Sequence, residues 1–390
     1  MGYEFYKVEP PPGVSFEDWM SWKWQYRNSL STAEQFQQYM ELSEDQVLAF
    51  EKARASFNIR VTPYYAALAG GSDPVPGIQR ILMPDLKELS LGAQQMLDPL
   101  GENKNRPTER IVHRYPDRVL FMVTDFCSVY CRYCTRKHFT GKDQAFPSKD
   151  EYTRALDYIA NHSEIREVIL SGGDPLTLGD ARLEKVLSDV QQIPHVDLVR
   201  IGSRIPTVAP MRISEELVNI FRRNKPVYFM AHFNHPREIT QESAHALELL
   251  VDNGVPVFNQ MVLLNGVNNH PALVYALSRR LLSLRVKPYY MFQVDPSEGT
   301  DHLRTSIEQS ESIQKSLWGK ASGLAMPNLS LDIPDGGGKA PLYPDFEIHR
   351  TQHSRTYTGW DGVTAEYINP AKETLIKPDD VSFYENETPS

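Results

Sequence analysis

Short apolar runs recur through the middle of this chain, and stretches with helical spacing of apolar residues separate them. The six runs begin near Val119, Glu167, Asp197, Val227, Pro256 and Val286. The last five starts lie about 30 residues apart, which is room for a strand, a crossover helix and their loops. This alternation predicts parallel βαβ units. Because six units are too few for an eight-stranded barrel, we predict an α/β fold, a curved and open partial (βα)6 barrel over residues 119–294.

The flanking regions have different patterns. Residues 1–118 show apolar residues at helical spacing, and Ser43 with Gln46 has the form of a capping box, so we predict a mostly helical N-terminal extension. Residues 295–390 begin with a Gly- and Pro-rich region, and we predict a β-rich tail after it. We expect the final stretch, 378–390, to be loosely ordered.

Composition narrows the function classes. The chain of 390 residues is 41% hydrophobic and 23% charged, as in ordinary globular proteins. Its net charge of -9 argues against general nucleic-acid binding. No apolar run is long enough for a membrane span, and the N-terminus has no signal-peptide core. We therefore expect a cytoplasmic protein that binds neither nucleic acid nor membrane.

All three cysteines lie in one short motif, CSVYCRYC, directly after the first predicted strand. The odd number argues against a disulfide framework, and scattered buried thiols would not cluster in this way. Active sites of such barrels lie at the carboxyl ends of the strands. Thiolates of Cys127, Cys131 and Cys134 suit an iron–sulfur cube with one open iron. Zinc is the alternative, with His138 as the fourth ligand.

The CxxxCxxC motif with Tyr133 before its last cysteine resembles the signature of the radical S-adenosylmethionine (SAM) enzymes, which share a six-unit partial barrel. A second motif, SGGDP, follows the second strand, where glycines allow a close backbone approach to a ligand. The resemblance implies that this stretch holds the amino group of the methionine moiety. It comprises Ser171, Gly172, Gly173 and Asp174.

Longer stretches narrow the resemblance to the lysine 2,3-aminomutase family. They include HRYPDR, REVILSGGDPL, HFNHPREIT, KPYYMFQVDPSEGTDHLRT and GGGKAPL, in that order. The family carries pyridoxal phosphate (PLP) on a lysine in a Gly-rich loop, which implies Lys339; Asp335 stands where many relatives have a further glycine. A lysine can form a Schiff base with an aldehyde. For the cofactor phosphate we consider Arg114 and Arg118, unless Asp117 pairs with one of them to hold the loop.

The resemblance also implies substrate contacts. Arg136 would bind the α-carboxylate, and Asp295 with Asp332 would bind the ε-ammonium of lysine. The implied enzyme is an isomerase that interconverts L-lysine and β-lysine through a 5′-deoxyadenosyl radical. Relatives with a C-terminal zinc site use cysteines there; this chain has none after Cys134, and His270 alone cannot form one, so we expect no zinc.

Other functions stay open from the sequence. The same chemistry could act on arginine, on glutamate or on a protein-bound lysine. A different class would be an iron–sulfur sensor or electron carrier, which would leave the Lys339 loop and SGGDP without a purpose. As partners we expect a small amino-acid substrate, a one-electron reductant of the flavodoxin or ferredoxin type, and further copies of the chain in a homo-oligomer.

Overall fold

A mixed sheet forms the centre of the computed structural model, which describes residues 3–53, 57–90, 92, 94–137, 139–141 and 146–369. In the described residues the sheet has nine strands, and they follow one another in chain order. β2 to β8 run parallel, whereas β1 and β9 pair antiparallel at the two edges. The strands are β1 (Ile111–Tyr115), β2 (Arg118–Thr124), β3 (Glu167–Gly172), β4 (Leu198–Ser203), β5 (Val227–Ala231), β6 (Val257–Leu263), β7 (Lys287–Gln293), β8 (Asn328–Ile333) and β9 (Gly338–Pro341).

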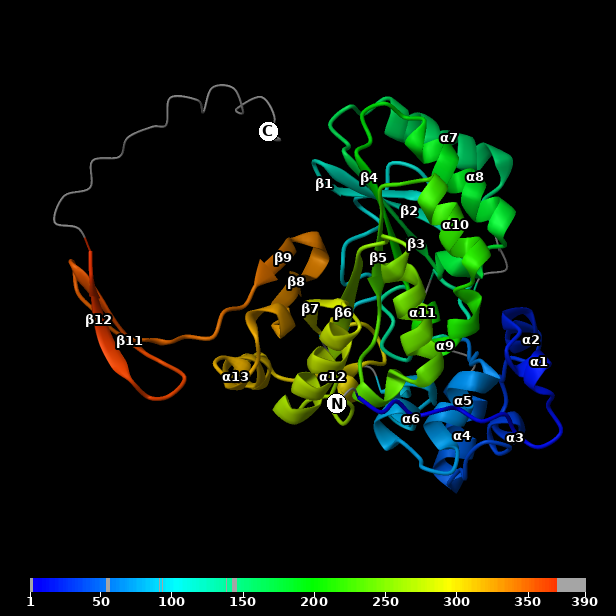
Figure 1. Cartoon of the computed structure of the whole chain (residues 1–390), viewed down its shortest axis with the longest axis horizontal. Helices are drawn as coiled ribbons and strands as arrows, with labels where there is room; N and C mark the ends of the chain where they lie inside the picture. The colour runs from blue at the N-terminus through cyan, green and yellow to red at the C-terminus, as the bar shows by residue number, and fades with distance from the viewer. Residues whose placement is uncertain are drawn as a thin grey trace.

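Crossover helices cover one face of this sheet, as Figure 1 shows for α7, α8, α10 and α11. They are α7 (Lys149–Ala160), α8 (Asp180–Gln191), the short α9 (Ile205–Val208), α10 (Glu215–Arg223), α11 (Gln241–Asp252), α12 (Pro271–Ser283) and α13 (Ile307–Leu317). The six predicted strands are confirmed as β2 to β7, and the sheet is the expected partial barrel. It continues past residue 294, because α13 leads to a further parallel strand, β8.

Burial alternates along β3, β4 and β6, which differs from the continuous burial expected of parallel strands. In β3 and β4 every second residue is buried, and those between are half-buried. The buried set, for example Val168, Leu170 and Ile201, packs into the main hydrophobic core with the helices. The other face is only partly covered because the barrel is open, and this leaves room for ligands.

The N-terminal helices pack against the barrel at the bottom of Figure 1. They are α1 (Phe16–Trp19), α2 (Trp22–Arg27), α3 (Ala33–Phe36), α4 (Glu44–Ala53), α5 (Pro63–Gly70) and α6 (Pro76–Leu82). Both hydrogen bonds of the predicted capping box form, between Ser43 and Gln46. Buried side chains of α5 continue the barrel's core, and the Thr62 hydroxyl donates to the Val208 carbonyl (2.5 Å). The helical extension and the barrel therefore share one core.

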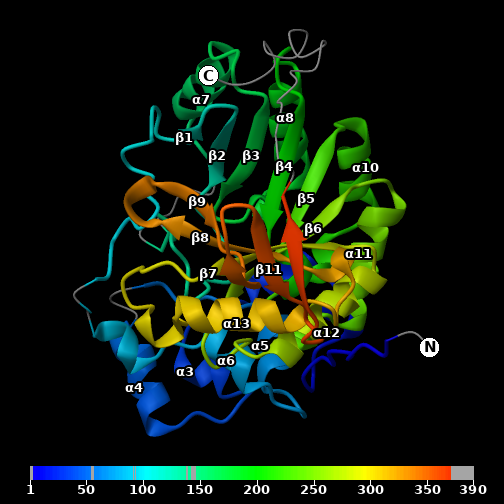
Figure 2. The same cartoon turned by 90° about the vertical axis from the view of Figure 1, so that its left-hand side faces the viewer.

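The predicted β-rich tail is confirmed by a separate three-stranded antiparallel sheet. Its strands are β10 (Glu347–Arg350), β11 (Ser354–Thr358) and β12 (Thr364–Ile368). It projects from the body in Figure 1 and lies in front of the main sheet in Figure 2. The stretch 378–390 lies outside the described residues. Within the part of the chain that is described, no helix is both long and apolar enough to cross a membrane.

Candidate active site at the carboxyl ends of the strands

The cysteine loop follows β2 and is tied to the N-terminal segments. The backbone N–H groups of Tyr130 and Arg132 donate to the carbonyl oxygens of Arg60 (3.0 Å) and Ile81 (3.0 Å). The fully buried Arg132 guanidinium also forms an ion pair with Glu88. Removing one partner of such a buried pair costs about 3–5 kcal/mol. The N-terminal segments therefore fix the position of the loop.

The three thiols lie together on this loop and are partly buried. Burial, together with the charge of Cys134, raises the pKa of Cys127 well above its usual range. Burial and the charge of Cys131 raise the pKa of Cys134 to about 11. A bound cationic metal group would reverse both effects, since thiolates are the form that binds metals.

The geometry of the thiols bears on which metal group fits. Among the described residues, no three or more His, Cys, Asp or Glu side chains are placed to hold a single metal ion. In an iron–sulfur cube each thiolate binds a different iron, so the thiols need not converge on one point, and they fit that group. His138, the ligand considered for zinc, lies outside the described residues. His270 accepts a hydrogen bond from the Ala272 N–H (3.2 Å) and so caps α12.

The two glycines of SGGDP allow close packing against the start of the cysteine loop. Gly172 has a φ of +118°, and a Cβ there would lie 2.3 Å from the Thr124 carbonyl oxygen. A Cβ on Gly173 would lie 2.3 Å from the Phe126 carbonyl oxygen. The sequence suggested approach to a ligand as the reason for these glycines. The structure gives a further one, because the end of β3 packs directly on the chain that enters the cysteine loop.

Asp174 joins the ends of two strands. Its carboxylate accepts hydrogen bonds from the Leu176 N–H (3.0 Å), the Ser203 hydroxyl (2.8 Å) and the Arg204 N–H (2.8 Å). Burial raises its pKa to about 6, although these donors oppose the shift. Both carboxylate oxygens already have protein partners, so the side chain positions β3 and β4 relative to each other.

Arg136 has a partner that the sequence did not reveal. Its Nε and Nη2 atoms donate to the Glu102 carboxylate at 2.6–3.0 Å, and its Nη1 donates to the Ser171 hydroxyl (3.1 Å). Both charged side chains are largely buried, with 19% of Arg136 and 12% of Glu102 exposed. Charged residues are rarely buried without a partner. From this rule a buried Arg136 is expected to have an anionic partner, but the sequence does not identify Glu102 as that partner.

A second group of predicted residues gathers around β8 and β9. The antiparallel register places Asp332 opposite Lys339. The Lys339 Nζ lies 3.3 Å from the Asp332 Oδ1, and the Arg114 Nη1 lies 3.6 Å from the same oxygen. Burial and the charge of Asp332 raise the pKa of Asp295 to about 7, although Lys339 and Arg114 oppose the shift. Residues from three separate stretches of the sequence thus form one electrostatic cluster: Arg114, Asp295, and the Asp332–Lys339 pair.

Unpartnered polar atoms in this cluster indicate a place for a ligand. The Arg114 Nε and Nη2 atoms and the Asp295 Oδ1 atom are buried and have no hydrogen-bond partner among the described residues. A Cβ on Gly338 would lie 3.8 Å from the Arg114 Nη2, so the Gly-rich loop passes close to this guanidinium. Buried orphan donors of a guanidinium suit an anion such as a phosphate. With the Lys339 amine nearby, these residues fit PLP.

Arg118 is placed differently from Arg114. It donates to the Asp117 carboxylate (2.5 Å) and its guanidinium lies 4.0 Å from the Tyr115 ring centroid. The Tyr115 hydroxyl accepts a hydrogen bond from the Lys339 N–H (3.1 Å). Arg118 is therefore the arginine that pairs with Asp117, as the alternative interpretation had it. It packs on Tyr115, whose hydroxyl binds the backbone of Lys339 on β9.

The 98–105 segment lies between the two groups of site residues. It supplies Glu102 to Arg136, and its Lys104 forms an ion pair with Asp335 (3.0 Å). The Asp335 N–H donates to the Pro99 carbonyl oxygen (2.9 Å). This residue has a φ of +58°, a left-handed conformation that aspartate tolerates better than most residues. The segment therefore supports both the Gly-rich loop and the arginine after the third cysteine.

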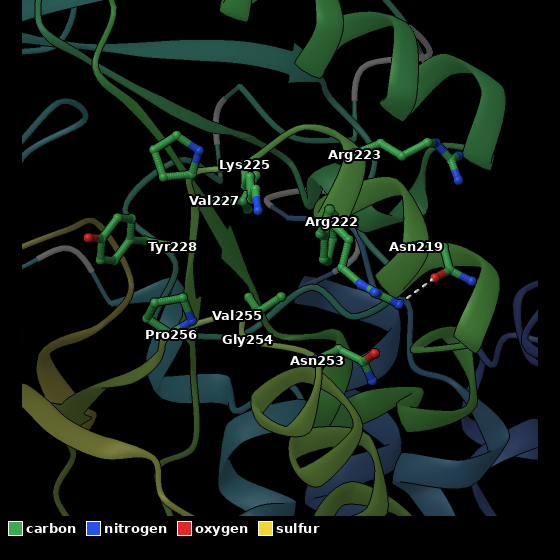
Figure 3. Close-up of a pocket in the computed structure, with 12 residues that line it drawn as sticks. Asn219, Arg222, Arg223, Lys225, Val227, Tyr228, Asn253, Gly254, Val255 and Pro256 are labelled. Atoms are coloured by element: carbon green, nitrogen blue, oxygen red, sulfur yellow. Dashed lines mark hydrogen bonds between the residues drawn. The ribbon is translucent and has the colours of Figure 1, made fainter.

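A separate cleft of about 900 Å³ lies at the amino-terminal ends of β5 and β6 (Figure 3). Arg222, Arg223, Lys225 and Tyr228 are among its lining residues, and none of the predicted site residues lines it. It lies at the opposite ends of the strands from the cysteine loop, where conservation and packing in such barrels serve stability. We therefore assign the chemistry to the carboxyl ends.

Comparison with known proteins gives matches to two family models and to curated relatives. Residues 121–275 match the family model described as Radical SAM superfamily, and residues 314–387 match the one described as Lysine-2,3-aminomutase. The chain is 40% identical to an L-lysine 2,3-aminomutase of Clostridium subterminale, over 95% of this chain and 88% of that protein. It is 41% identical to one of Methanococcus maripaludis, over 92% and 83%.

Another relative has a different named substrate. A glutamate 2,3-aminomutase of Clostridioides difficile is 39% identical, over 89% of this chain and 82% of that protein. Among solved structures, a radical SAM methyltransferase from Sphaerobacter thermophilus aligns with a TM-score of 0.42 and 16% identity, over 57% of this chain and 68% of that one. From the extent of the sequence matches, the chain belongs to the lysine 2,3-aminomutase family of radical SAM enzymes, which are isomerases.

Proposed function

We propose that this chain is a PLP-dependent 2,3-aminomutase that interconverts free L-lysine and β-lysine. One observation carries the proposal: Asp332 and Asp295 lie beside the Lys339 amine, and Asp332 already holds an ammonium group at 3.3 Å. This pair of carboxylates suits an ammonium ligand. It lies at the carboxyl ends of the strands, where the cysteine loop also lies.

The reaction defines what the chain must supply. A hydrogen on Cβ of an amino acid is not acidic enough for a side-chain base to remove. When bound, the iron–sulfur cluster with SAM supplies a carbon radical that can take such a hydrogen, and PLP supplies an aldehyde that condenses with an amine. The chain contributes placement, charge pairing and exclusion of water.

At the cluster side, Cys127, Cys131 and Cys134 would hold the irons, and the Ser171–Asp174 stretch would contact SAM. Arg136 would bind the substrate α-carboxylate. A guanidinium has five N–H groups, and Glu102 and Ser171 occupy those of Nε, one of Nη2 and one of Nη1. The remaining N–H groups of Nη1 and Nη2 can still donate to a substrate carboxylate, while Glu102 holds the side chain in place.

At the PLP side, the Lys339 Nζ would carry the cofactor and Arg114 would bind its phosphate, with Arg118 as the second candidate. The lysine amine must lose its charge before it can act as a nucleophile. The Asp332 Oδ1, at 3.3 Å, can take up that proton and release it to solvent, which leaves its carboxylate ionised. Asp332 would then lack an ammonium partner, and the ε-ammonium of a bound lysine would replace the charge that Lys339 gave up.

The same charges discriminate among amino acids. A glutamate substrate would bring a further carboxylate next to Asp295 and Asp332, and like charges in a buried site repel. Arginine carries a cation but a longer, planar head group, so its fit depends on space rather than on charge. A protein-bound lysine has no free α-carboxylate for Arg136. Free lysine satisfies all three anchors.

The test is product formation under anaerobic conditions. Reconstituted and reduced protein is incubated separately with lysine, arginine and glutamate, and β-amino acids are separated by chromatography. We expect β-lysine as the main product and loss of most activity in Asp332→Asn. Asp197→Asn is the matched control and should retain activity, because this aspartate is 55% exposed and pairs with Arg166 at the amino-terminal end of β4. Faster turnover of arginine or glutamate than of lysine would refute the substrate assignment.

We also propose a redox partner, an oligomeric state and a location for the enzyme. Radical formation needs one electron, so a flavodoxin- or ferredoxin-type reductant would serve the cluster. We also propose that the enzyme is a cytoplasmic homo-oligomer that binds no zinc and no nucleic acid. The net charge of -9 supports the last point.

A further inference from the structure

Arg204, at the carboxyl end of β4, donates directly to one of the three thiols. Its Nη1 lies 2.6 Å from the Cys131 Sγ and 2.9 Å from the Tyr133 hydroxyl. Its Nη2 donates to the Tyr65 hydroxyl (2.7 Å) and to the Glu238 Oε1 (2.8 Å). The side chain is buried. A cation is thus held against a single cysteine of the loop.

The surrounding network prevents this guanidinium from turning away. The Glu238 Oε1 also accepts from the Tyr65 hydroxyl (2.6 Å), and its Oε2 accepts from the N–H groups of Asn234 (2.5 Å) and His235 (2.9 Å). Glu238 is fully buried, and Asp174 fixes the backbone of Arg204 itself. Residues from the ends of three strands and from α5 therefore fix the direction in which the Arg204 N–H groups point.

The hydroxyl of Tyr133 completes the network on the cysteine side. Burial lowers the pKa of His232 to about 3, so its imidazole is neutral. The His232 Nε2 lies 2.8 Å from the Tyr133 oxygen and can accept its proton, while Arg204 and Asn234 donate to the same oxygen. The Tyr133 hydroxyl also interacts with the Cys131 side chain, so Arg204 and the tyrosine that it contacts meet at the same thiol.

The contacts of the thiols are unequal. Among the described residues, Cys134 receives a hydrogen bond from the Arg136 backbone, and Cys131 is the one cysteine whose sulfur receives a charged side-chain donor. Hydrogen bonds to cysteine sulfurs, net charge and burial set the reduction potentials of iron–sulfur clusters. A cationic donor stabilises the reduced cluster more than the oxidised one, because reduction adds a negative charge beside it.

We propose that Arg204 is a positioning residue that orients the Cys131 thiolate and raises the reduction potential of the iron–sulfur cluster through its N–H···S hydrogen bond. The step is a one-electron transfer: the external one-electron carrier loses one electron, the cluster gains it, and no bond to a proton changes. The role concerns electron uptake and is independent of which amino acid is the substrate. It follows from the placement of Arg204 against Cys131.

The test measures potential and iron content, not turnover. Reconstituted wild-type, Arg204→Gln and Tyr65→Phe proteins are poised at a series of applied potentials, and the reduced cluster is quantified by electron paramagnetic resonance. For Arg204→Gln we expect the ratio of reduced to oxidised cluster at a fixed potential to fall by at least about tenfold, which is 59 mV for one electron. Tyr65→Phe removes a hydrogen bond on the far side of the guanidinium and should change the ratio less than about twofold.

The outcomes separate the proposal from general disruption of the fold. Arg204→Gln with full iron content and an unchanged potential overturns it, and so do equal shifts in both variants. If Arg204→Gln folds but loses iron while Tyr65→Phe keeps it, the positioning part is supported, because Tyr65→Phe leaves the guanidinium contact to Cys131 in place. Equal iron loss in both variants contradicts it, since the network as a whole would then be responsible.

Discussion

Lysine use should weaken as the pH falls from about 8 to about 6, because Asp295 becomes protonated. Burial and the nearby Asp332 raise the pKa of this carboxyl to about 7. Its ionised fraction then falls from about nine-tenths to about one-tenth over this range, which is worth about 1.4 kcal/mol of ammonium binding. The sign follows from the charge: the protonated form is neutral and attracts the ε-ammonium less.

Loading of PLP affects the midpoint of this titration. Lys339 is one of the cations that oppose the raised pKa of Asp295. Once its amine carries the cofactor, that opposition weakens, and we expect the midpoint at or above about pH 7. Binding of the ε-ammonium acts in the other direction and releases a proton, so KM for lysine should carry the pH dependence more than kcat.

The assay is the initial rate of β-lysine formation, measured anaerobically at several lysine concentrations across this pH range. Asp295→Asn is the matched variant, because it keeps the shape and cannot ionise. It should lower kcat/KM by about ten- to a hundredfold, as expected for loss of a hydrogen bond to a charged group worth about 1.5–3 kcal/mol. Its remaining activity should be flat between about pH 6 and about pH 8. A pH dependence that persists in Asp295→Asn would refute the reasoning.

Three further changes test other parts of the site. Lys339→Ala should remove PLP that borohydride can fix to the chain, and leave the iron content unchanged; fixation on another lysine in the wild type would contradict this. Cys127→Ala should abolish SAM cleavage, which chromatography of 5′-deoxyadenosine measures, and full cleavage would refute its role as a ligand. Glu102→Gln should lower the free energy of unfolding by up to about 3 kcal/mol, because it leaves Arg136 largely buried without its anion. Glu109→Gln, whose pair is half exposed, should cost less than about 1 kcal/mol in the same denaturant titration, and equal losses would contradict the burial argument.

The strands that the sequence predicted best are those with helices on their outer face. β3 begins at Glu167 and β5 at Val227, where the apolar runs begin. Continuous apolar runs between helical stretches are typical of parallel strands, so local pattern and tertiary packing agree there. The open inner face explains why burial alternates in β3 nonetheless, because no second layer of helices covers that face in the part of the chain that the structure describes.

Elements beyond residue 294 were harder to predict. β8, with the sequence NLSLDI, is short and partly polar, and α13, with IEQSESIQKSL, carries few apolar residues. Both lie next to glycines and prolines that favour loops. Their place is set by β7, which pairs with β8 in parallel. A strand that depends on a partner for its definition cannot be recognised from its own pattern.

Candidate site residues also fall into two groups: those that stand in sequence motifs and those whose partners are set only by tertiary packing. Lys339, Asp332 and Asp295 could be predicted because they stand in extended motifs. Glu102 stands in a loop without periodicity, and its partner Arg136 lies 34 residues further on. Nothing in either stretch specifies that pairing, since a long-range ion pair depends on how β2 and the loop before β1 pack. The unequal contacts of the cysteines have the same origin, because Arg204 follows a different strand.

The 98–105 segment gives these separate contacts a common mechanical basis. Glu102 fixes the arginine after the third cysteine, and Lys104 fixes the Gly-rich loop through Asp335. A Cβ on Gly101 would lie 2.9 Å from Gly336, so the 98–105 segment and the Gly-rich loop pack against each other backbone to backbone. In the proposed reaction, a radical formed at one group would have to reach a substrate held at the other, and effective reaction requires near-contact geometry. Because the 98–105 segment contacts both Arg136 and the Gly-rich loop, it limits changes in the distance between the cysteine side and the Lys339 side of the site. The need for a fixed distance explains why this segment is closely packed although it has no regular secondary structure.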